Sequence, residues 1–334
     1  MGHAEYALTM NRPEPPPPAA RAVGPFVLVA GAASRDLTSD DPRGWRLGGA
    51  VTYAALTLAR LGLRVGAVVG VDAAAATAHE LDTLEAAGAI VIRSELAAGP
   101  VFEITETDRS RRLRCVSTSD PVSIFAVPRA WLVEGTPVFL GPVAGELGAD
   151  WTAVAAPHVA LGWQGLLREL RAGELVRRVA PEPHALLDVA TLVGVSREDL
   201  GRDLAPASAI RLLRPGATLV ATNGTNGGEV LEVGAEGLPT SSWRYMAVSP
   251  DRVIDPTGAG DVFLAAMLAA RLDPSLGPDV LVAAAAASLV IEGAGTAAVP
   301  TRAAVLERMR RAPSLASRWA SDDSSRARGF PSQA

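Results

Sequence analysis

Short β-rich runs alternate with helical patterns along most of this chain, and this alternation constrains the fold more than any other feature. Residues 26–30 predict a buried strand, residues 50–61 a helix, and residues 65–71 a second strand. Two strands joined by a crossover helix lie parallel in one sheet. We therefore predict an α/β fold with a mainly parallel central sheet.

The same pattern continues toward the C-terminus. Further strands are predicted at 89–92, 137–140, 158–161, 190–195, 217–222 and 229–233, with Ala-rich helices at 259–270 and 278–291 packed on the sheet.

Two segments, 37–47 and 101–117, lack helical periodicity. In the second, alternating runs on either side of 108–110 predict a β-hairpin that projects from the main sheet. We expect the two segments to form a small β lid that encloses a substrate and excludes water.

The two ends of the chain differ in composition from the rest. Residues 1–24 contain a proline run and predict a disordered leader, whereas the polar residues 312–334 predict a disordered tail. Residues 25–311 then form the folded domain. The best membrane-span candidate, 280–291, is too short, and no secretory signal pattern opens the chain. We expect a cytoplasmic protein that has no membrane partner.

Lysine is absent, so all 31 basic side chains are Arg. This excludes a Walker A loop, a protein-kinase strand lysine and Schiff-base chemistry, each of which needs an amine. Phosphate chemistry in this chain must rest on backbone amides, Arg and a metal. The net charge of -5 provides no basic surface, so a nucleic-acid partner is not expected.

Cysteine and histidine indicate no chemistry. The single Cys115 is interpreted as a small apolar filler on a strand, and the four histidines are scattered without metal-site spacing.

The motif Asp-Pro-Thr-Gly-Ala-Gly-Asp at 255–261 comes directly before an apolar helical run. Glycines at a helix start expose backbone N–H groups that bind anions. Asp261 would repel a phosphate there, so we interpret it as a base that accepts the proton of an attacking hydroxyl. The motif predicts a phosphotransfer site, and the alternative is a Gly-rich turn capped by an Asp.

Three other motifs each have two interpretations. Gly48 and Gly49 precede a helix, where tight packing is favoured over ligand approach. Asp36 either orients hydroxyls or is a surface charge. Residues 222–228 form either a hairpin turn or a loop whose amides and hydroxyls, including that of Thr225, hold nucleotide phosphates.

Ser196 and Asp199 have the spacing of a partial capping box at a helix start. Their oxygens could equally hold the waters of a magnesium ion, and both interpretations stay open.

Taken in order, these motifs resemble the ribokinase-like (PfkB) carbohydrate kinase family over residues 26–301. The family's N-terminal signature matches Gly48 and Gly49, and its C-terminal signature matches 255–261. The resemblance implies a three-layer α/β/α sandwich with a β lid. It implies that Asp261 is the catalytic base, that Gly258, Ala259 and Gly260 form the anion hole, that Thr222, Gly224, Thr225, Gly227, Asp255 and Thr257 lie on the nucleotide side, and that Asp36, Gly48 and Gly49 lie on the substrate side.

The chain departs from the family pattern at two places. Tyr53 stands where the family usually has Asn, and Ser196 and Asp199 replace an Asn-x-x-Glu motif that places magnesium. Tyr53, together with segments 115–122, 145–147 and 161–168, resembles the branch containing inositol kinases. This implies that Tyr53 and Gln164 contact the substrate.

The expected function is ATP-dependent phosphorylation of a hydroxyl on a small polyol or sugar, with myo-inositol as the leading substrate. ATP and Mg²⁺ are the implied cofactors, K⁺ is left open as a third, and the protein is expected to be a monomer or a homodimer formed through the lid.

Alternative functions are those of a ribokinase- or fructokinase-like sugar kinase and of a nucleoside kinase. A non-catalytic sugar- or nucleotide-binding regulator is a different class, but binding alone needs no base. A Rossmann dehydrogenase is disfavoured because no Gly-x-Gly-x-x-Gly follows the first strand.

Overall fold

The computed structural model describes residues 26–107, 110–154, 156–201 and 203–312. Within these ranges, the main sheet has nine strands in the order β15-β14-β13-β12-β9-β8-β1-β4-β5. They are β1 (Phe26–Ala32), β4 (Arg64–Val71), β5 (Ile90–Glu95), β8 (Val138–Leu140), β9 (Val159–Gly162), β12 (Leu192–Ser196), β13 (Thr218–Thr222), β14 (Gly228–Val233) and β15 (Pro239–Tyr245).

The strands from β13 to β5 pair in parallel, whereas β14 and β15 add an antiparallel edge. The predicted mainly parallel sheet is confirmed, and every predicted strand has a counterpart within a few residues. The edge strand β15 was not predicted. Most of its residues are exposed or half-buried, so it lacks the apolar run that marks the inner strands.

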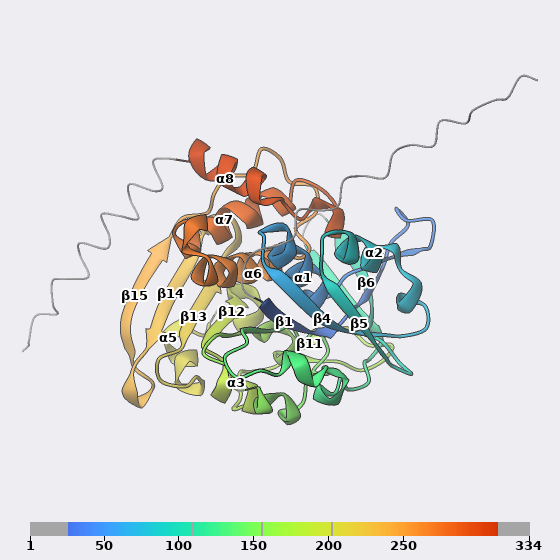
Figure 1. Ribbon diagram of the computed structural model, residues 1–334, viewed down its shortest axis with the longest axis horizontal. Coiled ribbons are helices and arrows are strands. Elements are labelled where there is room, and N and C mark those ends of the chain that lie inside the picture. Colours follow the sequence, from blue (N-terminus) through green and yellow to red (C-terminus); the bar gives the residue numbers. More distant parts are fainter. Residues whose placement is uncertain (1–25, 108–109, 155, 202, 313–334) are drawn as a thin grey trace, which may run out of the picture.

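Helices cover both faces of the sheet (Figure 1). One face packs against α1 (Ala50–Arg60), α2 (His79–Ala86), α6 (Ala259–Leu272), α7 (Asp279–Val290) and α8 (Arg302–Arg311). The other face is covered by 3-10 turns and the short helices α3 (Ala185–Val189), α4 (Arg197–Leu200) and α5 (Pro206–Ala209).

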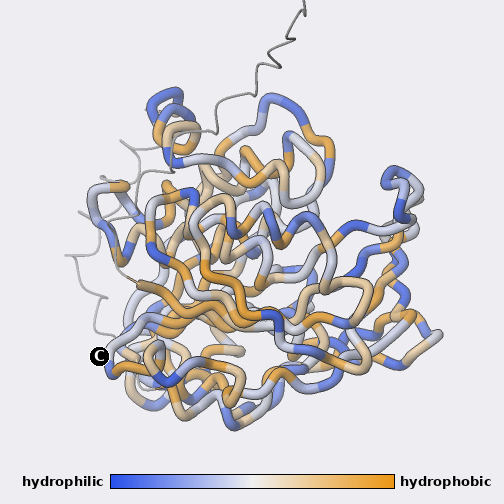
Figure 2. Tube along the Cα trace, turned by 45° about the vertical axis from the view of Figure 1, so that its right-hand side comes forward, coloured by the Kyte–Doolittle hydropathy of each residue, from blue (hydrophilic) through white to orange (hydrophobic). Residues whose placement is uncertain are grey.

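A separate hydrophobic cluster fills the space on each side of the sheet. Hydrophobic segments run through the middle of the molecule in Figure 2, and hydrophilic ones gather toward its periphery. The predicted α/β/α sandwich is thus confirmed, with one layer built from much shorter helices than the other.

A second sheet has the order β3-β2-β6-β7. It consists of β2 (Arg35–Leu37), β3 (Trp45–Leu47), β6 (Val101–Thr107) and β7 (Ser110–Ser117), and the antiparallel pairing of β6 with β7 confirms the predicted hairpin. Cys115 is buried on β7, as its interpretation required. The sheet begins earlier than predicted, because β2 includes Asp36.

The outer edge of β7, which no other strand of the second sheet covers, bonds to residues 174–176. This segment was not predicted to be extended. The N–H of Cys115 donates to the carbonyl of Glu174 at 2.9 Å, and the N–H of Val176 donates to the carbonyl of Leu113 at 2.8 Å. This segment connects β10 (Arg168–Glu169) to β11 (Arg177–Arg178), which pair antiparallel. The β10–β11 hairpin therefore ties the second sheet to the connection that follows β9.

Three predictions lie wholly or largely outside the described residues. The leader at 1–24, the tail from 313 onward and the hairpin tip at 108–109 are not described by the structure. None of the described helices combines the length and apolar character needed to cross a membrane.

Glu146 joins the carboxyl ends of two neighbouring strands. Its buried carboxylate accepts N–H bonds from Ala32 at the end of β1 (2.8 Å) and from Ala144 (2.8 Å) and Val143 in the loop after β8. Burial raises the pKa of Glu146, and these backbone donors oppose that shift. A carboxylate suits this site because both of its oxygens face donors.

Glu146→Gln should lower the free energy of unfolding by roughly 1 to 3 kcal/mol, because the amide NH₂ would face backbone N–H groups that need an acceptor. Urea unfolding measures the loss, with Glu134→Gln as a control at an exposed glutamate. An unfolding midpoint equal to that of the control would contradict this role for Glu146.

Candidate active site

The predicted anion hole lies at the start of α6. Gly258 is the N-cap residue of this helix, with a left-handed backbone (φ 78°, ψ −3°), and no side chain caps the helix end. A Cβ at Gly258 would overlap the ring of Tyr53, so both the backbone conformation and the packing require glycine. The loop before it is folded by Asp255, whose Oδ1 accepts the N–H of Thr257 at 2.9 Å.

Asp261 lies in the first turn of α6, beside these backbone groups. Its carboxyl is partly buried, and burial raises its pKa to about 7. Arg168 opposes the rise, whereas the negative charges of Asp199 and Asp36 add to it. The carboxyl can therefore bind and release a proton near neutral pH.

Asp36 lies on β2, just beyond the end of β1. The hydroxyl of Ser34 donates to its Oδ1 at 2.9 Å. A Cβ at Gly48 would overlap the Asp36 carboxylate, and one at Gly49 would overlap the carbonyl of Ala32. The two glycines thus allow the start of α1 to press against the β1–β2 turn, which supports the packing interpretation and brings Asp36 close to that helix end.

Tyr53 on α1 fills the space between the substrate side and the anion loop. Its side chain is buried, and its ring lies against Gly258. Burial raises the pKa of the Tyr53 hydroxyl, and the nearby charges of Asp36, Asp255 and Asp261 raise it further. Tyr53 is therefore a neutral hydroxyl within electrostatic reach of three carboxylates.

Ser196 is the last residue of β12 and the N-cap of α4, and Asp199 lies within α4, as the capping-box interpretation requires. The Ser196 Oγ accepts the N–H of Asp199 at 2.9 Å and donates to Asp199 Oδ2 at 2.6 Å. Gln164 Nε2 donates to the same Oδ2 at 2.9 Å, and Arg168 donates to Oδ1 at 3.2 Å. The structure therefore places Gln164 with Asp199, and both oxygens of this carboxylate already accept a donor.

Magnesium placement at Ser196 and Asp199 stays a prediction. In the described parts of the chain, no three Asp, Glu, His or Cys side chains are arranged closely enough to hold a metal ion by themselves. Mg²⁺ is commonly held by one or two carboxylates together with phosphates and water, and the oxygens of Ser196 and Asp199 are of the right kind for that arrangement.

Arg168 was not among the residues predicted for the site. It comes six residues after the end of β9, as the last residue of the segment 161–168 that resembles the inositol-kinase branch, but only Gln164 of that segment was given a role. The absence of lysine was a further signal, because any permanent positive charge from a Lys or Arg side chain in this site has to come from Arg.

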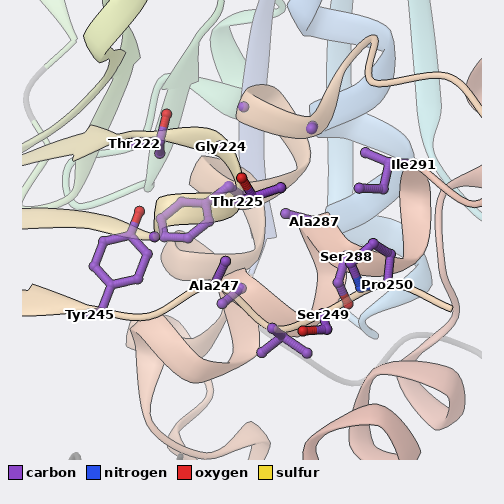
Figure 3. A pocket seen from close by; sticks show the side chains of 16 residues that line it. Thr222, Gly224, Thr225, Tyr245, Ala247, Ser249, Pro250, Ala287, Ser288 and Ile291 are labelled. Atoms are coloured by element: carbon purple, nitrogen blue, oxygen red, sulfur yellow. The ribbon is translucent and has the colours of Figure 1, made fainter. Parts of the chain in front are cut away.

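A pocket opens beside the predicted anion hole, between the loop after β13 and helices α6 and α7 (Figure 3). Thr222, Gly224, Thr225 and Gly227 line it, so the predicted nucleotide loop faces the same space as Ala259 and Gly260 of α6. Most of the remaining lining is apolar and includes Val248, Phe263, Ala284, Ala287 and Ile291.

Arg308 on α8 fixes one wall of this pocket. The buried guanidinium donates to the carbonyl of Ser249 (3.1 Å), the hydroxyl of Ser288 (3.2 Å) and Glu292 Oε1 (2.7 Å). Ser249 and Ser288 both line the pocket. The last described helix, which sequence reasoning did not predict, therefore supports the site from behind.

The predicted site residues thus lie in two groups in the structure. Asp36, Gly48, Gly49 and Tyr53 lie on the side of β1 and α1, and the nucleotide-loop residues line the pocket at α6. Asp261 is within electrostatic reach of Asp36 and Asp199. A carboxyl of raised pKa at a helix N-terminus, next to a pocket, is an arrangement suited to proton transfer beside an anion.

Comparison with known proteins gives a consistent result. The family model described as "pfkB family carbohydrate kinase" matches residues 177–302. No curated protein matches the chain. Among solved structures, a pyrophosphate-dependent kinase in the ribokinase family, complexed with a pyrophosphate analog and myo-inositol, has a TM-score of 0.64 and 19% identity over 84% of this chain and 99% of its own.

Two further structures have a similar fold. The nucleoside kinase of Methanocaldococcus jannaschii has a TM-score of 0.59 and 16% identity over 86% of this chain and 98% of its own. A putative ribokinase II from E. coli, in complex with ATP and Mg²⁺, has a TM-score of 0.62 and 16% identity over 86% and 99%. The chain therefore has the ribokinase fold, and its residues 177–302 have the sequence pattern of the pfkB family of carbohydrate kinases.

Proposed function

We propose that this protein is a kinase that transfers the γ-phosphoryl group of ATP to a hydroxyl of a small polyol or sugar. The observation that carries the proposal is the position of Asp261. This carboxyl, with a pKa raised to about 7, lies at the start of α6 between the Asp36 side and the pocket that contains the predicted nucleotide loop.

The chemistry follows from the charges around Asp261. In the ionised form it accepts the proton of the acceptor hydroxyl while that oxygen attacks the γ-phosphorus. Backbone N–H groups at the start of α6 stabilise the negative charge on the phosphoryl oxygens. Asp36 and the neutral Tyr53 hydroxyl are suited to orient the acceptor. Bound Mg²⁺, near Ser196 and Asp199, would neutralise charge on the donor phosphates.

The apolar pocket supports a nucleotide as the phosphoryl donor. Pyrophosphate has no apolar surface, so it would gain nothing from a wall formed by Val248, Phe263 and Ile291, whereas an adenine base would. This favours ATP even though one of the similar structures is a pyrophosphate-dependent kinase. The two donors should be compared directly in one assay.

For the acceptor, we propose myo-inositol first. Support comes from Tyr53, which gives the substrate side a larger and less polar residue than Asn, and from the similar kinase that was solved with myo-inositol. Ribose, fructose and adenosine are the competing acceptors, and a nucleoside kinase is also among the similar structures.

A matrix of these four acceptors with ATP or pyrophosphate tests the proposal by measuring phosphorylated product. We expect turnover with ATP and myo-inositol. Thermal stabilisation by ligands without consumption of either donor would indicate a binding protein instead of an enzyme.

Asp261→Asn should lower kcat by at least about 100-fold, because a general base typically contributes that much or more. ATP binding, measured by calorimetry, should be retained. Asp82→Asn, at an exposed acid on α2, is the matched control. Turnover close to that of this control would reject Asp261 as the base.

The same variant should be more stable than the wild type. A folded-state pKa near 7, above the ordinary value of 3.8, means that the protonated carboxyl favours the fold and that this contribution is lost as the pH rises toward 7. The neutral amide avoids that loss. The gain in unfolding free energy should therefore be larger at pH 8 than at pH 5, and an equal gain at both would contradict the raised pKa.

The pH dependence of kcat/KM reports the same group in the free enzyme. Since only ionised Asp261 accepts a proton, kcat/KM should rise with pH and level off above a midpoint of about 7. An initial-rate series from pH 5 to 9 would show this, and a profile that is flat across the series would contradict it.

A further inference from the structure

Arg168 brings a permanent positive charge close to the centre of the site. It lies on β10, directly after the turn that ends β9, and its side chain is 18% exposed. Its guanidinium forms an ion pair with Asp199 at 3.2 Å. The positive charge of Arg168 also lowers the pKa of Asp261, whereas the negative charges of Asp199 and Asp36 raise it.

Two sets of contacts hold this guanidinium in place. Asp199 is itself fixed from the other side by Gln164 and Ser196, so the anchor of Arg168 cannot rotate freely. Next to Arg168, the paired strands β10 and β11 and the segment bound to β7 hold the backbone. A cation that is oriented before the ligand arrives loses little entropy when it binds an anion.

The guanidinium keeps capacity to bind a ligand. It has five N–H donors in a planar fork, and within the described residues one of them is used, in the bond to Asp199 Oδ1. Because Gln164 and Ser196 already donate to Asp199 Oδ2, Arg168 bonds to Oδ1 alone and does not form the paired, two-bond contact that Arg and carboxylates favour. The remaining donors suit the oxygens of a phosphoryl group.

We propose that Arg168 is a catalytic residue that binds the non-bridging oxygens of the transferred phosphoryl group beside Asp261. The inference rests on the proposed kinase function and deepens it. In the reaction, the acceptor O–H proton moves to Asp261, the bond from the acceptor oxygen to the γ-phosphorus forms, and the bond from that phosphorus to the ADP oxygen breaks. Arg168 stays protonated throughout and stabilises the charge on the oxygens.

The chain has no lysine that could share this task. Cations of this kind act mainly in the transition state of phosphoryl transfer, where charge spreads over the equatorial oxygens. The loss of Arg168 should therefore lower kcat strongly and change the KM of the acceptor little.

The test compares Arg168→Met and Arg168→Ala with Arg171→Ala, which removes an exposed arginine from the same hairpin. In the acceptor assay, we expect kcat of both Arg168 variants to fall by about 100-fold or more, with the acceptor KM within a few-fold of the wild type. Added guanidinium ion at millimolar concentration should restore part of the turnover of Arg168→Ala and leave Arg171→Ala unchanged.

A second readout is the pH profile. Arg168 favours the ionised form of Asp261, whereas Asp36 on β2 and Asp199 in α4 favour its protonated form. The variant Arg168→Met should therefore move the midpoint of the kcat/KM profile to higher pH. If Arg168 served only as the ion-pair partner of Asp199, added guanidinium ion would not restore the turnover of Arg168→Ala.

Two results would overturn the proposal. One is a kcat of Arg168→Met close to that of the wild type, and the other is a loss of turnover that guanidinium does not restore in Arg168→Ala. Failure of the kinase function is distinct from both, because the wild-type protein would then phosphorylate none of the acceptors in the same assay.

Discussion

Parallel pairing of the inner strands is the constraint on which this site depends. Because β1, β9, β12 and β13 run in the same direction, the residues that follow each strand meet at one edge of the sheet. Asp36 follows β1, Arg168 follows β9, Asp199 follows β12, and the predicted nucleotide loop follows β13. Helix α6 packs on one face of the sheet and contributes Asp261 from its first turn, so residues more than 200 positions apart in the chain act on one another.

The proximity of Asp36, Asp199 and Asp261 lowers the stability of the folded state. Asp261 has lost part of its solvation, and its two acidic neighbours make ionisation still less favourable. A well-packed core on both faces of the sheet can tolerate such a cost, and proteins commonly concentrate it where chemistry occurs. Arg168 relieves the repulsion without removing it, which leaves Asp261 able to exchange a proton near neutral pH.

The sequence predicted the inner strands and the main helices well, because buried parallel strands are continuous apolar runs and α6 and α7 are Ala-rich. The motif at 255–261 correctly predicted that Asp261 lies in the first turn of a helix, since a helix start rich in glycine has a local pattern, whereas its role as an anion hole stays a prediction.

Most of the features that sequence reasoning missed depend on contacts between distant parts of the chain. The segment between β10 and β11 bonds to β7 about 60 positions earlier, and Arg308 bonds to the carbonyl of Ser249 59 positions earlier, so neither has a local signature. Arg168 was missed for the same reason: its importance comes from Asp199 and Asp261, which other elements supply. The strand β15 pairs with its neighbour β14 and was missed because most of its residues are exposed or half-buried.

The contact of Tyr53 with Gly258 couples the two sides of the site. The Tyr53 ring occupies the volume that any side chain at 258 would need, and it lies beneath the loop that is predicted to bind the phosphoryl group. A shorter residue at position 53 would open a cavity under that loop and let it move. In this chain, a change in acceptor preference made through Tyr53 would therefore also alter the geometry of phosphoryl transfer, so the two properties cannot be engineered or evolve independently at this position.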